Sequence, residues 1–308
     1  MASELEGYYA TLRRTDTAMR KYDGLQDQHF NKSLRAPNVW EVDLPLSVIN
    51  EAHDIFRANG LGEAFLSLKR SDACHAQVGA GVEGGRFFLL RSAGVGSDGT
   101  GMGGRSSDIT WISVDDERSY DRLQGLFSRL GLESVFDGVV HPWERLRMYS
   151  AYFVVRSCCE EPHLHFDYPE EVGTKALTLM TPLAVYRVRS TFNLIYRQQP
   201  LRKNIAGGDE YVAGGDERYD ECARYEYKVG TGIVFGASFQ HSTEPGRAHP
   251  VDGMHVYLCF TFGTDRQQDW PMIFGAVGGN QSRVVCTMEG QLVLTKLGRR
   301  LLDEANAS

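Results

Sequence analysis

The sequence predicts an α+β protein that is mainly β, with a jelly-roll core that follows N-terminal helices. Two observations lead to this fold class. Before residue 131, apolar residues recur at the 3.6-residue spacing of helices in three segments. From Leu146 onward they fall instead in short β-rich runs that turn residues separate. A series of short strands behind a helical segment is typical of a sandwich or barrel with helices packed against it.

The chain of 308 residues is expected to form one structural unit made of two parts. Residues 1–104 would supply N-terminal helices and a glycine-rich loop that pack on the core. Residues 105–308 would form the β core and a C-terminal extension. Apolar residues make up 42% of the chain and charged residues 24%, which is ordinary for a globular protein.

Composition and the N-terminal segment argue against several classes of protein. The net charge of −7 argues against a nucleic-acid partner. No apolar run approaches the ~18 residues of a membrane span, so no membrane association is expected. The first residues lack the basic start and apolar run of a secretory signal, and six cysteines in a chain this long do not indicate a disulfide framework. We therefore expect a cytoplasmic protein.

Three helices are expected in the first 130 residues. Residues 4–24 carry a loose apolar stripe on a polar segment. Residues 45–59 form a clearer amphipathic helix that Gly60 ends, and residues 115–130 form the third helix, which ends at Gly131. The apolar face of the second helix consists of Val48, Ile49, Ala52, Ile55 and Phe56, and that of the third of Leu123, Leu126, Phe127 and Leu130.

A glycine-dense segment, residues 79–104, lies between the second and third helices. Residues 94–99 match the dinucleotide-binding pattern G-x-G-x-x-G, and a strand-forming run, residues 86–90, precedes them. The helix that such a site needs is missing, because more glycines and the strand-forming run 109–112 follow. We interpret the segment as a loop and as a candidate lid over a site.

Strands are expected throughout the second half of the chain. Pro182 should interrupt one of them, because proline lacks an amide donor for the ladder. Residues 199–221 are glycine-rich and acidic, which favours a long surface loop and a second candidate lid. The expected strands are 148–155, 176–188, 191–197, 225–228, 232–235 and 255–262, followed by 284–286 and 291–295 before a short polar tail.

Three residues in this half have the chemistry of a metal site. His165 and Asp167 form an H-x-D motif, and His241 follows in a later segment. Side chains alternate along a strand, so a strand would present His165 and Asp167 on the same face. Two histidines and one carboxylate are the facial set that holds non-haem Fe(II) and leaves positions open for O₂ and a co-substrate.

The order of these motifs resembles the Fe(II)/2-oxoglutarate-dependent dioxygenases, in particular their prolyl 4-hydroxylase-like branch. The likeness covers residues 105–265 and rests on four segments. The resemblance implies a double-stranded β-helix, which is a jelly roll, and a site that uses Fe(II), 2-oxoglutarate and O₂, with ascorbate as a reductant. It implies hydroxylation of a C–H bond in a peptidyl proline or a small molecule. The four segments are 105–112, the H-x-D at 165–167, 229–245 with its distal His before Glu-Pro, and 255–262.

The chain departs from this family at the residue that binds the distal carboxylate of 2-oxoglutarate. The family normally has Arg or Lys at the start of the last core strand, and His255 stands there. A protonated imidazole or a neutral hydrogen bond from His255 would serve, or a cation from elsewhere. The candidates are Arg187 and Arg189 on one face of a strand, Arg247 after the distal histidine, and a hydroxyl from Tyr152.

Other functions remain open at this point. His163, His165, Glu170 and His241 resemble a cupin set, H-x-H-x₄-E with a later His, and a cupin-like or other Fe(II) oxygenase would use a co-substrate other than 2-oxoglutarate. A protein that kept the barrel only for binding is a third class. The sequence does not separate a small-molecule substrate from a peptide, and it does not indicate an oligomeric state.

Overall fold

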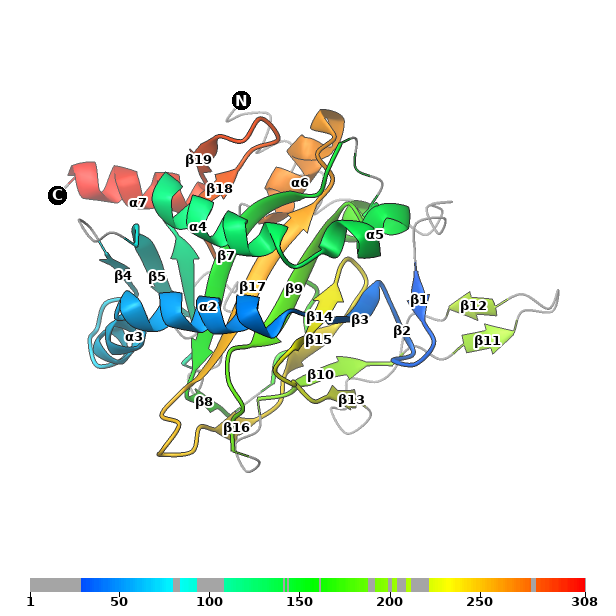
Figure 1. Ribbon diagram of the computed structural model, residues 1–308, viewed down its shortest axis with the longest axis horizontal. Coiled ribbons are helices and arrows are strands. Elements are labelled where there is room, and N and C mark those ends of the chain that lie inside the picture. The colour runs from blue at the N-terminus through cyan, green and yellow to red at the C-terminus, as the bar shows by residue number, and fades with distance from the viewer. Residues whose placement is uncertain are drawn as a thin grey trace.

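The structure is a computed structural model that describes most of the chain after residue 28 (Figure 1). Three expectations lie outside the described residues: the helix at 4–24, the G-x-G-x-x-G match and the placement of Arg189. The described residues are 29–79, 84–92, 108–140, 142, 144–160, 162–187, 192–198, 201–203, 209–211, 222–277 and 281–307.

An eight-stranded antiparallel sheet forms the centre of the fold. Its longest pairing joins β7 to β17, and this pairing sets Tyr152 opposite Cys259 and Arg156 opposite His255. In spatial order the strands are β3 (Val39–Asp43), β14 (Thr231–Phe235), β9 (Ala176–Pro182), β17 (His255–Gly263), β7 (Arg147–Arg156), β6 (Thr110–Val114), β5 (Phe87–Arg91) and β4 (His75–Val78).

Smaller sheets pack on one part of this central sheet. The first contains β13 (Cys222–Tyr225), β10 (Leu194–Arg197) and β15 (His241–Thr243), and the second pairs β8 (Cys158–Cys159) with β16 (Gly246–Arg247). Buried residues of β10 and β13 pack with residues of β3 and β14, so two layers enclose a core. The mainly β jelly-roll fold class with supporting helices is confirmed.

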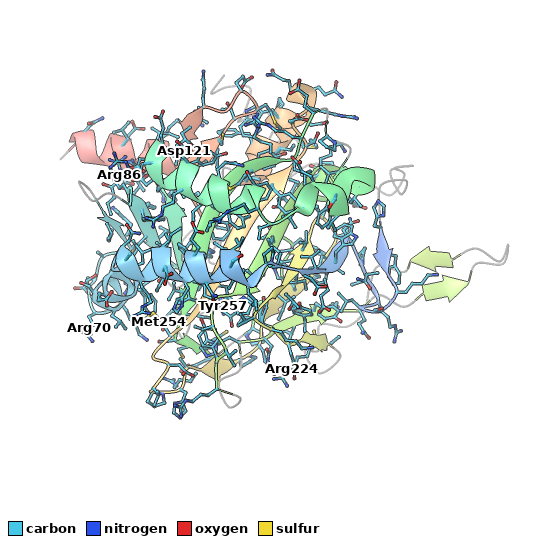
Figure 2. All side chains as sticks on the ribbon, viewed as in Figure 1. Arg70, Arg86, Asp121, Arg224, Met254 and Tyr257 are labelled. Carbon is cyan, nitrogen blue, oxygen red and sulfur yellow. The ribbon has the colours of Figure 1, made fainter. Side chains whose placement is uncertain are left out.

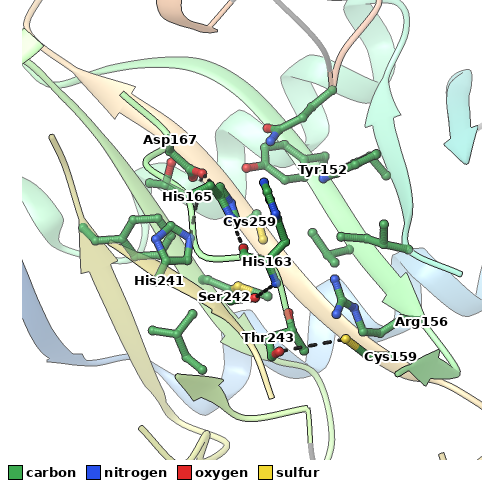
Figure 3. A pocket seen from close by; sticks show the side chains of 18 of the residues that line it. Tyr152, Arg156, Cys159, His163, His165, Asp167, His241, Ser242, Thr243 and Cys259 are labelled. Carbon is green, nitrogen blue, oxygen red and sulfur yellow. Dashed lines mark hydrogen bonds and ion pairs between the residues drawn. The ribbon is translucent and has the colours of Figure 1, made fainter. Parts of the chain in front are cut away.

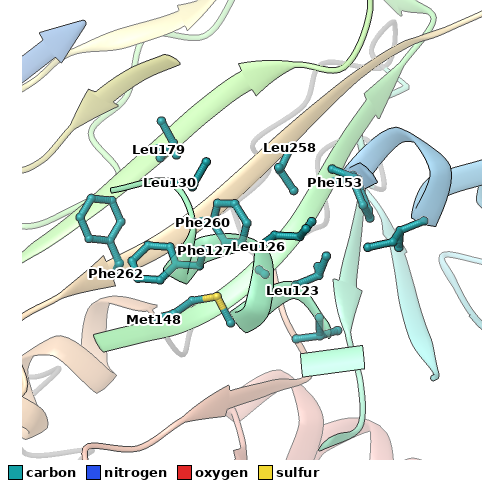
Figure 4. Packing of buried hydrophobic residues seen from close by; sticks show 14 of the residues in the cluster. Leu123, Leu126, Phe127, Leu130, Met148, Phe153, Leu179, Leu258, Phe260 and Phe262 are labelled. Atoms are coloured by element: carbon teal, nitrogen blue, oxygen red, sulfur yellow. The ribbon is translucent and has the colours of Figure 1, made fainter. Parts of the chain in front are cut away.

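Helices cover the other face of the central sheet (Figure 1). They are α2 (Leu46–Ala58), α3 (Leu61–Lys69), α4 (Glu117–Ser128) and α5 (Leu132–Val140). The apolar faces that the sequence predicts for α2 and α4 are all buried against this sheet, with Leu123, Leu126 and Phe127 of α4 facing Phe260 and Phe262 of β17 (Figure 4). Charged side chains such as Arg70, Asp121 and Arg224 lie at the outside (Figure 2).

Several elements differ from the prediction. The expected strand 225–228 lies earlier, at Cys222–Tyr225, and the expected loop 199–221 contains β11 (Leu201–Lys203) and β12 (Asp209–Tyr211). β9 ends at Pro182, as the missing amide donor requires, so Arg187 lies beyond the strand rather than on it. The sequence analysis did not identify α3, α5, α6 (Trp270–Val277) or α7 (Lys296–Ala307), the last of which occupies the polar tail.

Short elements complete the described part of the chain. β18 and β19 form the expected C-terminal hairpin. None of the helices between residues 29 and 307 that the structure describes is both long and apolar enough to span a membrane. The remaining bounds are β1 (Phe30–Asn31), β2 (Ala36–Pro37), η2 (Glu170–Val172), η4 (Gln267–Asp269), β18 (Val284–Cys286) and β19 (Leu292–Leu294).

Candidate metal centre

His165, Asp167 and His241 meet at one point in the fold. One donor atom from each lies within 4.8 Å of the others. Nε2 of His165 is 3.3 Å from Oδ1 of Asp167, and Nε2 of His241 is 3.8 Å from the same oxygen. Metal–ligand bonds of about 2.1 Å at right angles place their donors about 3 Å apart. The three side chains therefore fit around one metal ion after small movements.

Backbone pairing, rather than one strand, brings the donors together. His165 and His241 form an isolated antiparallel bridge, with N–H···O distances of 2.9 and 3.0 Å in the two directions. Asp167 follows in a bend, so the expectation that a single strand presents the H-x-D motif is wrong. Pro162 and Pro169 flank the segment and lack the amide donors that a longer ladder needs.

The backbone also fixes the orientation of both imidazoles. Nδ1 of His165 lies 2.8 Å from the carbonyl oxygen of His163, and Nδ1 of His241 lies 3.1 Å from that of Phe239. A carbonyl oxygen can only accept a hydrogen bond, so Nδ1 of each ring must carry the hydrogen and donate it. In the neutral ring, the lone pair is then on Nε2, which lies beside Asp167. Metal-binding histidines are oriented in this way by a hydrogen bond to the second ring nitrogen.

The ionisation states of the three side chains suit a cation. Burial acts to raise the pKa of Asp167, but the hydrogen bond with His165 and the nearby imidazoles outweigh it and hold the pKa below its usual value. Burial lowers the pKa of His241 to about 4, so this ring is neutral at pH 7. Burial also opposes protonation of His165, yet the hydrogen bond and charge of Asp167 raise its pKa, and a metal ion would displace that proton.

A cavity extends from these donors into the space between the sheets (Figure 3). Arg156, at the end of β7, points into it, and only 6% of this residue is exposed. Within the described part of the chain, no carboxylate forms an ion pair with Arg156, and the Cys159 thiol lines the same cavity. The remaining wall is largely apolar, with Trp111, Tyr227 and Cys259 among its residues.

The sequence analysis missed Arg156, although the signal was present. It named Tyr152 as a residue facing the site and expected the strand to end at Val155. Tyr152, Val154 and Arg156 lie at i, i+2 and i+4 of β7 and all line the cavity, as alternation along a strand requires. If the predicted strand had been extended by one residue, the prediction would have placed the guanidinium of Arg156 beside the metal motif.

The other expected co-substrate residues have different positions. Tyr152 lines the cavity, and burial raises the pKa of its hydroxyl well above the usual value. His255 stacks on Tyr186 with ring centroids 3.8 Å apart and lines a separate pocket; burial lowers its pKa to about 4, so it is neutral at pH 7.

Two arginines from the expected set lie outside the cavity of the triad. Arg187 is exposed, with Nε 3.8 Å from a carboxylate oxygen of Asp252. Arg247 is also exposed and lies 3.0 Å from Glu160. Both guanidinium groups therefore have carboxylate neighbours at the surface.

The cupin-type set is not assembled. His163 lines the cavity, and its ring lies parallel to that of His165 with centroids 6.1 Å apart. Among the described residues, the group of donors close enough to share a metal contains neither His163 nor Glu170. The arrangement is two imidazoles and one carboxylate.

Comparisons with known proteins give one kind of match. No protein-family profile and no curated protein sequence matches the chain. Among solved structures, a Pseudomonas putida prolyl-4-hydroxylase is 11% identical, over 74% of this chain and 92% of that chain, with a TM-score of 0.38. The viral collagen prolyl hydroxylase of Paramecium bursaria Chlorella virus-1, in complex with 2-oxoglutarate, is 10% identical. The match covers 73% of this chain and 96% of that chain, with a TM-score of 0.34.

A third solved structure is an α-ketoglutarate-dependent epimerase, SnoN, of nogalamycin biosynthesis. It is 16% identical over 73% of this chain and 78% of that chain, with a TM-score of 0.40. Because the identities and TM-scores are low, these matches do not assign a function to the chain.

Proposed function

We propose that this protein is an Fe(II)- and 2-oxoglutarate-dependent oxygenase that hydroxylates a C–H bond. The observation that carries the proposal is the convergence of His165, Asp167 and His241, with both imidazoles oriented by backbone carbonyls. Two histidines and a carboxylate leave open metal positions on one side. Bound Fe(II) would supply the coupled oxidation of 2-oxoglutarate to succinate and CO₂ and of the substrate C–H to C–OH by O₂.

Arg156 is the residue that we assign to the distal carboxylate of 2-oxoglutarate. Its guanidinium is buried in the cavity of the triad and has no carboxylate partner among the described residues. A buried cation without a counter-charge is costly, and a guanidinium matches a carboxylate through two parallel hydrogen bonds. A co-substrate that brings a carboxylate to this end of the cavity would compensate the charge.

The position of Arg156 explains why the usual cation can be absent from the last core strand. Arg156 and His255 are direct partners across the β7–β17 ladder, so the cation lies at the same level of the barrel on the neighbouring strand. His255 is neutral at pH 7 and packs between aromatic rings instead. Of the remaining candidates, Tyr152 lines the cavity and would add a hydroxyl beside the co-substrate.

The rest of the cavity wall favours a dry site. Trp111, Tyr227, Phe235 and Cys259 line it, and burial raises the pKa of the Cys259 thiol well above its usual value, so it stays neutral. Apolar walls exclude water from the reacting groups and strengthen the attraction between Arg156 and a carboxylate. A peptidyl proline or a small molecule remains the substrate, and ascorbate remains the expected reductant.

Iron-dependent succinate formation tests this function. We expect the purified protein with Fe(II), O₂ and 2-oxoglutarate to form succinate, even slowly without a substrate, and Asp167→Ala to abolish it. Val185→Ala is the control, because Val185 is 86% exposed and lies outside the cavity. Equal succinate formation by Asp167→Ala and the wild type would exclude the proposed site.

The second candidate function is an Fe(II) oxygenase, cupin-like or otherwise, with another co-substrate. The observation in its favour is that His255, at the position where the family has a cation, is neutral and outside the cavity. This function would be supported if iron binds to the triad and added 2-oxoglutarate does not bind to that iron.

A further inference from the structure

A second chamber adjoins the metal triad on the side away from Arg156. It encloses about 160 Å³ and shares Tyr152, Asp167, Thr178 and Gln281 with the first cavity, whereas Arg156 lines only the first. Asp167 therefore faces both chambers. A co-substrate held by Arg156 would reach the metal from the first cavity. A second molecule could reach the same metal from the second chamber without displacing the co-substrate.

The inner wall of this chamber is made of neutral hydroxyl groups. Ser150 Oγ lies 2.9 Å from Ser282 Oγ, and the Tyr168 hydroxyl lies 2.7 Å from Thr178 Oγ1. Each hydroxyl keeps a further lone pair or its proton for another partner. Apart from Asp167, the described lining residues carry no carboxylate, ammonium, guanidinium or imidazole group. Such a wall binds carbonyl or hydroxyl groups and leaves a buried charge uncompensated.

The rim of the chamber is apolar and comes from two distant parts of the chain. Phe166, between the two ligands of the H-x-D motif, is 53% exposed. Ala276 and Val277, at the end of α6, and Gln281 line the chamber as well. An exposed aromatic ring at the entrance can pack against an apolar ring of a ligand.

We propose that this chamber binds the reacting group of the prime substrate, and that this group is an uncharged ring or branched chain of about six heavy atoms carrying a hydroxyl or carbonyl. The size follows from the volume, since a cavity of about 150 Å³ accommodates a benzene-sized ring. The lack of charge follows from the hydroxyl wall. The inference rests on the proposed function for the metal, but binding to the chamber itself requires neither iron nor turnover.

Ligand-observed NMR with three matched probes tests the chamber directly. The probes are cyclohexanol, cyclohexanecarboxylate and cyclohexylammonium, and the sample is the protein with Zn(II), which is redox-inert, and saturating 2-oxoglutarate. We expect cyclohexanol to bind at least about tenfold more tightly than either charged ring. We also expect cyclohexanol to bind the metal-free protein. This measurement tests the chamber even if the proposed metal site is wrong.

Two variants and a control locate the binding. Ala276→Phe fills the chamber and should abolish binding of cyclohexanol, and Phe166→Ala should weaken it about three- to tenfold through loss of the ring contact. Val185→Ala, on an exposed residue outside both chambers, should leave it unchanged. Phe166→Ala keeps the test valid if Ala276→Phe does not fold, because Phe166 is largely exposed.

The outcomes separate the proposal from its alternatives. Absence of cyclohexanol binding at millimolar concentration, equal binding of a charged ring, or displacement of cyclohexanol by 2-oxoglutarate would each overturn it. N-acetylproline methylamide, an uncharged capped residue, shows whether the bound group belongs to a peptide or to a free small molecule. Displacement of cyclohexanol by this compound supports a peptidyl substrate, and binding of cyclohexanol alone supports a free small molecule.

Discussion

In the proposed function, the guanidinium of Arg156 recognises the co-substrate. It is buried beside Tyr152 and Val154 in the cavity of the triad, and no described carboxylate forms an ion pair with it. Sequence analysis considered five other residues instead, namely Tyr152, Arg187, Arg189, Arg247 and His255. The strand that carries Arg156 was predicted, but its end was placed one residue too early. The strand pairing that sets Arg156 opposite His255 is set by the tertiary structure and not by the local sequence.

We expect Arg156→Met to raise the KM for 2-oxoglutarate. Hydrogen bonds to a charged group contribute about 1.5–3 kcal/mol, which corresponds to an increase of roughly ten- to a hundredfold. Arg156→Lys should recover part of the loss, because it keeps the charge and loses the fork. Steady-state kinetics of succinate formation measure the change. An unchanged KM in Arg156→Met beside a raised KM in His255→Phe would return the role to His255.

His255 should affect the pH dependence of stability rather than co-substrate binding. Burial lowers its folded-state pKa to about 4 against a usual value of 6.5, with the charge of Asp252 acting in the opposite direction. Between these pH values the unfolded chain binds more protons than the folded one, so the free energy of unfolding falls as pH drops from 6.5 to 4. The group contributes on the order of 1–3 kcal/mol to this fall.

Substitution of His255 by Phe tests this assignment. The variant keeps an aromatic ring against Tyr186 and removes the titration, so urea unfolding at pH 7, 6, 5 and 4 should show a shallower loss of stability than in the wild type. The difference between the two proteins should grow as pH falls. Parallel pH profiles would mean that His255 is not buried in its neutral form.

At the scale of elements, sequence periodicity predicted α2, α4 and the main strands of the core, but it missed four other helices and did not predict how segments meet. The faces of α2 and α4 follow from their spacing alone. His165 and Asp167 were expected on one strand, whereas His165 forms a single bridge with His241, which lies 76 positions later. That bridge depends on the distant β15 and its neighbour β10, so no local pattern contains it. The residue types of the metal site were predictable, and their backbone support was not.

The start of α4 depends on a reciprocal cap. Asp116 Oδ1 accepts a hydrogen bond from Ser119 N at 2.8 Å, and its Oδ2 accepts one from Arg86 N at 2.9 Å. We expect Asp116→Ala to lower the free energy of unfolding by about 1–2 kcal/mol, because one helix amide and one loop amide lose their acceptor. Asp121→Ala, on the exposed side of the same helix, should change it by less than about 0.5 kcal/mol. Denaturant titration compares them, and equal losses would contradict the cap.

At the scale of the whole molecule, the fold places helices on one face of the large sheet and the site on the other. Phe260 is fully buried at the helix–sheet layer, 5.5 Å from Phe127 between ring centroids (Figure 4). We expect Phe260→Ala to destabilise the protein by about 3–5 kcal/mol, through lost burial and a residual cavity. Thermal unfolding beside Val185→Ala measures this, and a loss below about 1 kcal/mol would mean that the layer repacks freely.

The second chamber shows what the sequence did not predict at this scale. Its walls combine the beginning of β7, the end of β17, the H-x-D segment and the segment that follows β17. The sequence suggested lids in the glycine-rich segments 79–104 and 199–221, most of which lie outside the described residues. Among the described elements, α6 and the residues Gln281 and Ser282 are parts beyond the barrel that border the chamber. Contacts between segments this far apart arise from packing, and no periodicity in one segment reveals them.

The most direct test of the central claim is anaerobic titration of 2-oxoglutarate into the Fe(II)-loaded protein, followed by visible absorption. The 2-oxo acid gives a charge-transfer band only when it binds Fe(II) directly. We expect a saturable band in the wild type and in Val185→Ala, and none in Asp167→Ala. Iron bound at the triad with no band at saturating 2-oxoglutarate, or an undiminished band in Asp167→Ala, would contradict the account.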